Sequence, residues 1–200
     1  MQEKKTWKRE LREWIVSIAV ALMVVFILRT FLFQIIRVDG HSMDTTLADN
    51  ERLLVSVLDV RLNGVERGDV VICHYPNRGR TDFVKRVVAV PGDVVYRENF
   101  ATHVVYNVVG EDGSVETVDE VLDPYIPGYV HPCLNSPDYA PYTLGEDEYF
   151  VVGDNRYYSH DSRDWNDDDP SKDVGPISGN MIVGRVRRVI WPIESARSVE

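Results

Sequence analysis

The sequence is poor in cysteine and in basic residues. Its two cysteines, Cys73 and Cys133, allow one disulfide or two isolated buried thiols, and the sequence leaves both open. The 22 Lys and Arg residues face 32 Asp and Glu residues, for a formal net charge of −10. Because phosphate binding needs a basic face, this balance argues against nucleic acid as the main partner. There is no internal repeat, and 200 residues suggest one domain with an appendage.

The polar segments also lack the pattern of a known metal site. The acidic stretch "NDDDPSKD", residues 166–173, has neither the glycine nor the terminal glutamate of a calcium-binding loop. Runs of charge are usually solvated, so we expect an exposed loop there. We therefore predict no metal and no cofactor.

Charge is absent from "WIVSIAVALMVVFIL", residues 14–28, which follows a basic head at residues 1–13. A bilayer needs about 20 apolar residues, so the sequence predicts a single transmembrane anchor within residues 14–36. A cleaved secretory signal and a buried core helix are the alternatives, but the following "FLFQI" has no small residues for cleavage. The basic head predicts a cytoplasmic N terminus and an extracytoplasmic remainder at the cell membrane.

The rest of the chain has short apolar runs of period two, separated by Gly, Pro, Asn and Asp, which predicts a mainly β domain. The predicted strands are 52–57, 69–75, 83–90, 93–97, 103–109, 114–118, 148–152 and 181–191. Many prolines and tyrosines at 123–147 indicate an irregular excursion. We expect a β core at 37–95 and 148–200, with an insertion at 96–147.

One predicted strand contains a lysine among apolar residues. In "RTDFVKRVVAVPGD", residues 80–93, Lys85 is surrounded by Phe83, Val84 and Val87. Strand alternation would allow it to point to solvent beside Arg86. The other interpretation is burial that removes its proton, because desolvation disfavours the charged form. A neutral lysine is a base able to take the proton of a serine hydroxyl.

Two more stretches hold polar side chains at turns: "VDGHSMDTTL" at 38–47 and "GDNRYYSHDSRDW" at 153–165. With the lysine strand between them, and with an apolar segment before all three, these stretches resemble the type I signal peptidases, which are membrane-bound Ser/Lys endopeptidases. The stretch "IVGRVRRVIWP" at 182–192 extends the resemblance. A single anchor is most similar to the Gram-positive branch.

The resemblance implies a signal-peptidase-like β-sheet domain that removes signal peptides from exported preproteins. It implies Ser42 as nucleophile, Lys85 as general base and Ser159 as the hydroxyl that orients the lysine. With Gly40 added at the oxyanion side, the residues that we expect to support the site are Gly40, Gly153, Asp154, Asn155, Arg156, Asp161 and Arg163. Two positions depart from the family pattern: Thr45 stands where proline is usual, and Gly40 where some relatives have an oxyanion-binding serine.

The substrate is expected to add as a strand near residues 38–42 and 82–85. The residues predicted to contact it are Met43, Asp82, Phe83 and Val84. The family implies Ala-x-Ala sites with small side chains before the cleaved bond. The lipid bilayer and the secretion machinery are the further expected partners.

Two other functions compete with this interpretation. His41 adjoins Ser42, and His160 adjoins Asp161, so a Ser-His-Asp protease is one alternative. His41 would point away from Ser42 in an extended strand, because successive side chains alternate. The other alternative is a non-catalytic, membrane-tethered β module that binds a partner through the long insertion.

Overall fold

The computed structural model describes residues 7–27, 32–123, 137–165 and 173–199. The helices are α1 (Trp7–Ile27), α2 (Val57–Asn63) and the short 3-10 turns η2 (Gly179–Met181) and η3 (Ile193–Ser195). The strands are β1 (Phe33–Arg37), β2 (Arg52–Ser56), β3 (Val70–Cys73), β4 (Phe83–Ala89), β5 (Val94–Glu98), β6 (Ala101–Val109), β7 (Val115–Val121), β8 (Tyr139–Thr143), β9 (Glu148–Val152), β10 (Ile177–Ser178), β11 (Ile182–Trp191) and β12 (Arg197–Ser198). The prediction of a mainly β protein is confirmed.

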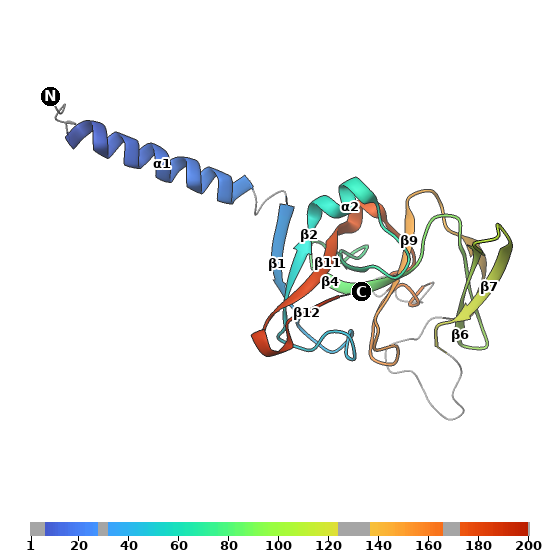
Figure 1. The fold of residues 1–200 in the computed structure, drawn as a ribbon. Coiled ribbons are helices and arrows are strands. Elements are labelled where there is room, and N and C mark those ends of the chain that lie inside the picture. The colour runs from blue at the N-terminus through green and yellow to red at the C-terminus, as the bar shows by residue number, and fades with distance from the viewer. Residues whose placement is uncertain (1–6, 28–31, 124–136, 166–172, 200) are drawn as a thin grey trace.

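The strands form two antiparallel sheets. The main sheet has the order β1-β2-β11-β3-β4-β9-β10, with β12 paired to β11, and the second sheet has the order β7-β6-β5-β8. In Figure 1, α1 stands apart on one side of the main sheet, and β6 and β7 lie on the other. Phe150 of the main sheet and Val104 of the second, both fully buried, belong to one apolar cluster that joins the sheets. The site described below lies on the main sheet, on β4 and the loops next to it.

The sequence pattern found eight strands and missed several shorter elements. Helix α2 has only seven residues, too few for a helical period to stand out; Ser56 caps it by accepting a hydrogen bond from the Asp59 N–H. Strand β8 lies in the predicted irregular excursion and contains Pro141. It is the edge strand of its sheet, where proline is tolerated because one side of the strand needs no donor.

The predicted anchor at 14–36 needs a correction. Helix α1 ends at Ile27, and Phe33–Arg37 is strand β1, paired antiparallel with β2. A short apolar run fits a helix and a strand equally well, and here the neighbouring strand decides. Within the described residues, no helix is long and apolar enough to cross a membrane.

The question of a disulfide concerns two cysteines in different situations. Cys73 is a free, fully buried thiol on β3, and burial raises its pKa to about 12. A thiol held in its protonated form is a poor nucleophile. Cys133 lies outside the described residues.

Candidate active site

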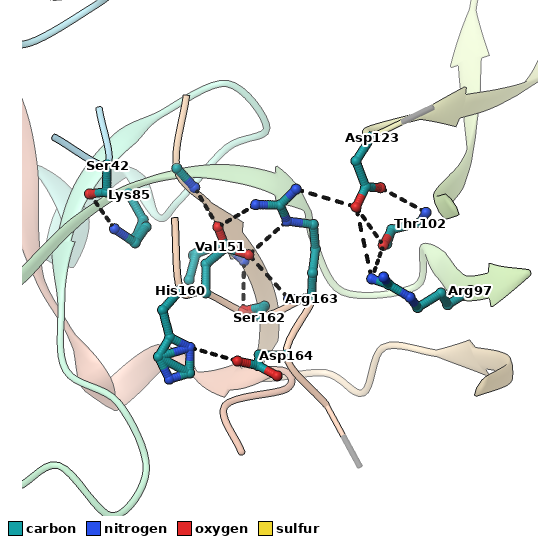
Figure 2. A network of polar contacts seen from close by, with 12 residues as sticks. Ser42, Lys85, Arg97, Thr102, Asp123, Val151, His160, Ser162, Arg163 and Asp164 are labelled. Carbon is teal, nitrogen blue, oxygen red and sulfur yellow. Dashed lines mark hydrogen bonds and ion pairs between the residues drawn. The ribbon is translucent and has the colours of Figure 1, made fainter. Parts of the chain in front are cut away.

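Lys85 and Ser42 meet at the centre of the predicted site. Lys85 is the third residue of β4, and its Nζ donates a hydrogen bond of 2.7 Å to Ser42 Oγ. Figure 2 shows the two side chains pointing at each other, Ser42 from the loop that follows β1. The lysine is only 2% exposed, so strand alternation turns it inward and not toward solvent. The next residue, Arg86, has both Nε and Nη2 bonded to Asp154, at 2.9 Å each.

The surroundings of Lys85 favour its neutral form. Burial lowers the pKa of the amine below its ordinary value, while the charges of Asp161 and Cys73 act in the opposite direction. The positive charge of Arg163 adds to the lowering. Because a deprotonated amine is the form that accepts a proton, this lowering of the pKa favours Lys85 as a base.

The loop that carries Ser42, residues 38–51 between β1 and β2, is called the serine loop. The turn after β9 holds it in place. The N–H of Asn155 donates to the carbonyl of Ser42 at 3.0 Å, and the Asn155 side-chain amide donates to the carbonyl of His41 at 2.9 Å. The Thr46 hydroxyl donates to Asp154 Oδ2 at 2.5 Å. Three hydrogen bonds therefore tie two loops that are more than 100 residues apart in the sequence, and they set the position of Ser42 relative to β4.

A buried ion pair lies behind this turn. Arg163 donates from Nε and Nη2 to the two oxygens of Asp161, at 2.8 and 2.9 Å, and neither residue is exposed. Burial alone raises the pKa of Asp161, but the charge and hydrogen bonds of Arg163 outweigh it and lower the pKa to about 2. Asp161 Oδ2 also accepts from the N–H of Gly153, at 3.0 Å. The carboxylate therefore stays ionised and fixes the start of the turn.

Ser159, the hydroxyl predicted to orient Lys85, is buried beside Gly153. Its hydroxyl is fully buried, but it makes no hydrogen bond to Lys85, nor to any other group that the structure describes. It lies near enough to the Asp161 carboxylate to help lower its pKa, without the geometry of a hydrogen bond. It also lies directly against Gly153, where an added Cβ would overlap both its Oγ and the carbonyl oxygen of Ser42. The turn after β9 therefore packs directly against the serine loop at Gly153.

The four predicted substrate contacts occupy different environments. Met43 is 1% exposed and its Sδ accepts from the Asp154 N–H, so its side chain packs in the core. Val84 packs against the same core cluster. Phe83 stacks on Tyr75 with ring centroids 4.1 Å apart. Asp82 is exposed and pairs with His74 at 2.9 Å.

The two remaining predicted supports, Gly40 and Arg156, are partly exposed. Gly40 has φ of +107°, a conformation that favours glycine, and its N–H donates to Asp49 Oδ1 at 3.0 Å. That N–H is therefore engaged within the loop. Arg156 is half-buried, and burial lowers the pKa of its guanidinium.

The histidines do not form a triad with the serine. His41 points outward and pairs with Asp44 at 3.1 Å, and His160 lies 3.0 Å from Asp164, as Figure 2 also shows for the second pair. The group that contacts Ser42 is the Lys85 amine. In the part of the chain that the structure describes, no three His, Cys, Asp or Glu side chains are grouped to hold a metal ion.

Sequence reasoning missed a second support of the serine loop at the other end of the chain. Arg197 of β12 binds both oxygens of Glu51, at 2.7 and 2.9 Å, and donates to the carbonyl of Thr46 at 2.5 Å. Glu51 in turn accepts from the N–H of Ala48. The partners are about 150 residues apart in the sequence, and no local pattern signals such a contact.

Comparison with known proteins places the chain in a family. The family model described as "Signal peptidase, peptidase S26" matches residues 11–191. Signal peptidase IB of Staphylococcus aureus is 35% identical over 187 residues, which cover 92% of each chain. Signal peptidase I P of Bacillus subtilis subsp. natto is 32% identical over 196 residues, 98% of this chain and 97% of the relative. With this coverage and the site described above, the chain belongs to the signal peptidase family, peptidase S26.

Proposed function

We propose that this protein is a serine endopeptidase that cleaves N-terminal signal peptides from exported preproteins, with Ser42 as nucleophile and Lys85 as general base. The observation that carries the proposal is the 2.7 Å contact between Ser42 Oγ and the buried Lys85 amine. A serine hydroxyl needs a base within hydrogen-bond reach, and a lysine can be that base only when it is neutral.

The reaction follows from the geometry of these two groups. The neutral amine takes the proton of the Ser42 hydroxyl as Oγ attacks the scissile carbonyl, and the backbone N–H of Ser42 is the donor that we assign to the oxyanion. The resulting ammonium of Lys85 then gives its proton to the leaving amine. The same amine next removes a proton from water as the water attacks the acyl-enzyme. As the bond between the acyl carbon and Oγ breaks, the ammonium returns a proton to Oγ, which frees the acid product and restores the Ser42 hydroxyl and the neutral amine.

We assign substrate binding to the first half of β4. Strand β4 pairs with β3 from Phe83 onward, but its pairing with β9 begins only at Arg86. The backbone of residues 82–85 is therefore open on that side for an added peptide strand, next to Lys85. We expect small side chains before the cleaved bond, as in Ala-x-Ala sites, and contacts of the enzyme with the secretion machinery.

We also propose that the apolar segment beginning at Trp14 holds the enzyme at the cell membrane by a single pass, with the N terminus in the cytoplasm. Large apolar side chains of α1 are exposed, among them Trp14 (69%) and Phe26 (67%), and the helix stands apart from the sheets (Figure 1). Exposed apolar side chains of this size are suited to a lipid environment. Protease accessibility of tags at the two termini in intact cells tests the orientation; digestion of the N-terminal tag alone would contradict it.

Cleavage of a preprotein by the purified enzyme in detergent tests the catalytic assignment. We expect Ser42→Ala and Lys85→Met each to abolish processing, and His41→Ala and His160→Ala to retain it. The wild-type rate should fall on the acid side as Lys85 becomes protonated. Processing that survives in Lys85→Met and fails in His160→Ala would establish a histidine base instead.

A further inference from the structure

A line of buried charges connects the second sheet to the active site. Asp123 lies two residues after the end of β7, is 5% exposed, and accepts a hydrogen bond of 2.7 Å from the N–H of Thr102 on β6. Its Oδ2 also accepts from Arg163 Nη1 at 3.3 Å and lies 3.8 Å from Arg97 Nη1 on β5. Figure 2 shows Asp123 between the two guanidinium groups. The carboxylate thus joins the second sheet to the loop that follows β9.

Arg163 divides its donors between two carboxylates. Nε and Nη2 bind Asp161, whereas Nη1 faces Asp123. Since a guanidinium presents its donors in a rigid planar fork, two carboxylates on different edges determine its orientation fully. Asp161 in turn holds the N–H of Gly153, which lies against the carbonyl of Ser42. The contacts are therefore continuous from the second sheet to the serine loop.

The charges along this line alternate in sign. The line has two negative and two positive side chains, in the order Asp161, Arg163, Asp123 and Arg97. Each of them is at most 5% exposed. A buried ion is stable only when paired, so loss of one member leaves its partner uncompensated. Arg163 would then have a free Nη1 in a site closed to water, and would move to find another acceptor.

We propose that Asp123 is a positioning residue for the Ser42/Lys85 reaction: by fixing the third donor of Arg163, it sets the place of Asp161 and of the Gly153 contact with the serine loop. This rests on the proposed function. The second sheet, which holds Asp123 through Thr102 and Arg97, is then part of the catalytic assembly.

The proposal has an electrostatic consequence at Lys85. The charged groups that act on the amine are Asp161, Cys73, Arg163 and Asp154. Replacement of Asp123 by Asn leaves the line of charges with one excess positive charge, which disfavours protonation of Lys85. The acid limb of the pH–rate profile should then move to lower pH. Simple loosening of the site would admit water and move that limb to higher pH, toward the pKa of ordinary lysine.

The test is Asp123→Asn in the full chain in detergent, assayed for kcat, KM and the pH–rate profile on a preprotein. Asn keeps the oxygen that accepts from the Thr102 N–H, but it replaces the Oδ2 that faces Arg163 with an NH2 group, so both the charge and the acceptor of Arg163 Nη1 are lost. We expect kcat to fall roughly tenfold at unchanged KM, because small displacements of reacting groups lower rates strongly. The matched control is Asp138→Asn, whose carboxylate is exposed and binds the N–H groups of Asn99 and Phe100. It should keep wild-type kcat and the wild-type profile.

A second variant covers the outcome that Asp123→Asn does not fold. Arg97→Gln removes a positive charge from the same line but leaves the contact between Asp123 and Arg163 in place. It should move the acid limb to higher pH, opposite to Asp123→Asn, without the fall in kcat that loosening of the site would bring. Wild-type kcat and an unmoved acid limb in either folded variant would overturn the proposal. Retained cleavage in Ser42→Ala would instead refute the proposed function, so the two failures are distinguishable.

Discussion

The substitution Gly153→Ala tests how closely the turn after β9 is packed against the loop that carries the nucleophile Ser42. An added Cβ would overlap the Ser159 hydroxyl and the Ser42 carbonyl oxygen, well inside the 3.4 Å at which ordinary contact begins. The Ser42 carbonyl belongs to the backbone and accepts from the N–H of Asn155 at 3.0 Å, so it cannot avoid the overlap by a side-chain rotation. Either the serine loop or the turn must move.

The expected displacement is on the order of 1 Å, the size of misplacement that lowers enzyme rates about 100-fold. It would lengthen the 2.7 Å contact between Ser42 Oγ and Lys85 Nζ beyond a good hydrogen bond. We therefore expect kcat to fall about 100-fold, equivalent to about 3 kcal/mol in the activation free energy. Crowding of a packed interior should also reduce the free energy of unfolding by about 1–3 kcal/mol.

The assay is cleavage of a preprotein in detergent, with kcat expressed per folded enzyme and stability measured by urea denaturation. Gly184→Ala is the matched control. Its Cβ would meet Val55 Cγ1 at 2.8 Å and the Ser56 carbonyl oxygen at 2.9 Å, in β2 and away from the dyad. It should lose stability but keep kcat. If Gly153→Ala kept wild-type kcat, or if both variants lost kcat in proportion to stability, the reasoning would be refuted.

Three further predictions concern stability. The pKa of Asp161 is lowered from 3.8 to about 2 in the folded state. Its ionised form therefore stabilises the fold above about pH 4, and this stabilisation is lost as the pH falls toward 2. In urea denaturation, the stability gap between wild type and Asp161→Asn should shrink by about 2 kcal/mol over that range; a constant gap would contradict the ion pair. Thr45 has φ of +87°, so Thr45→Gly should raise the free energy of unfolding by about 1 kcal/mol, and a decrease would show that no strain is stored there. Arg197→Met should cost about 1 kcal/mol, since its side chain is two-fifths exposed, and should speed hydrogen exchange at Ala48 and Glu51; unchanged exchange would show that β12 does not hold the loop.

Much of both sheets was predictable because their strands carry their signal locally. The eight predicted strands have alternating or continuous apolar residues between turn residues, and all eight are present. Strand β1 was not separable from the apolar segment before it, because only pairing with β2 distinguishes strand from helix there. Helix α2 was too short, and β8 was obscured by its proline.

The sequence by itself determined the β class, the membership of Ser42 and Lys85 in recognisable motifs, and the apolar company of the lysine. These are properties of residue type and short spacing. Only the tertiary structure decided that the amine faces the hydroxyl at 2.7 Å, that Ser159 does not bond the lysine, and that Asp123 and Arg197 support the site from distant segments. The physical reason is that burial and ion pairing depend on which chain segments meet in space. The contacts of Lys85, Asp123 and Arg197 each join residues at least 40 positions apart in the sequence, so no local pattern signals them.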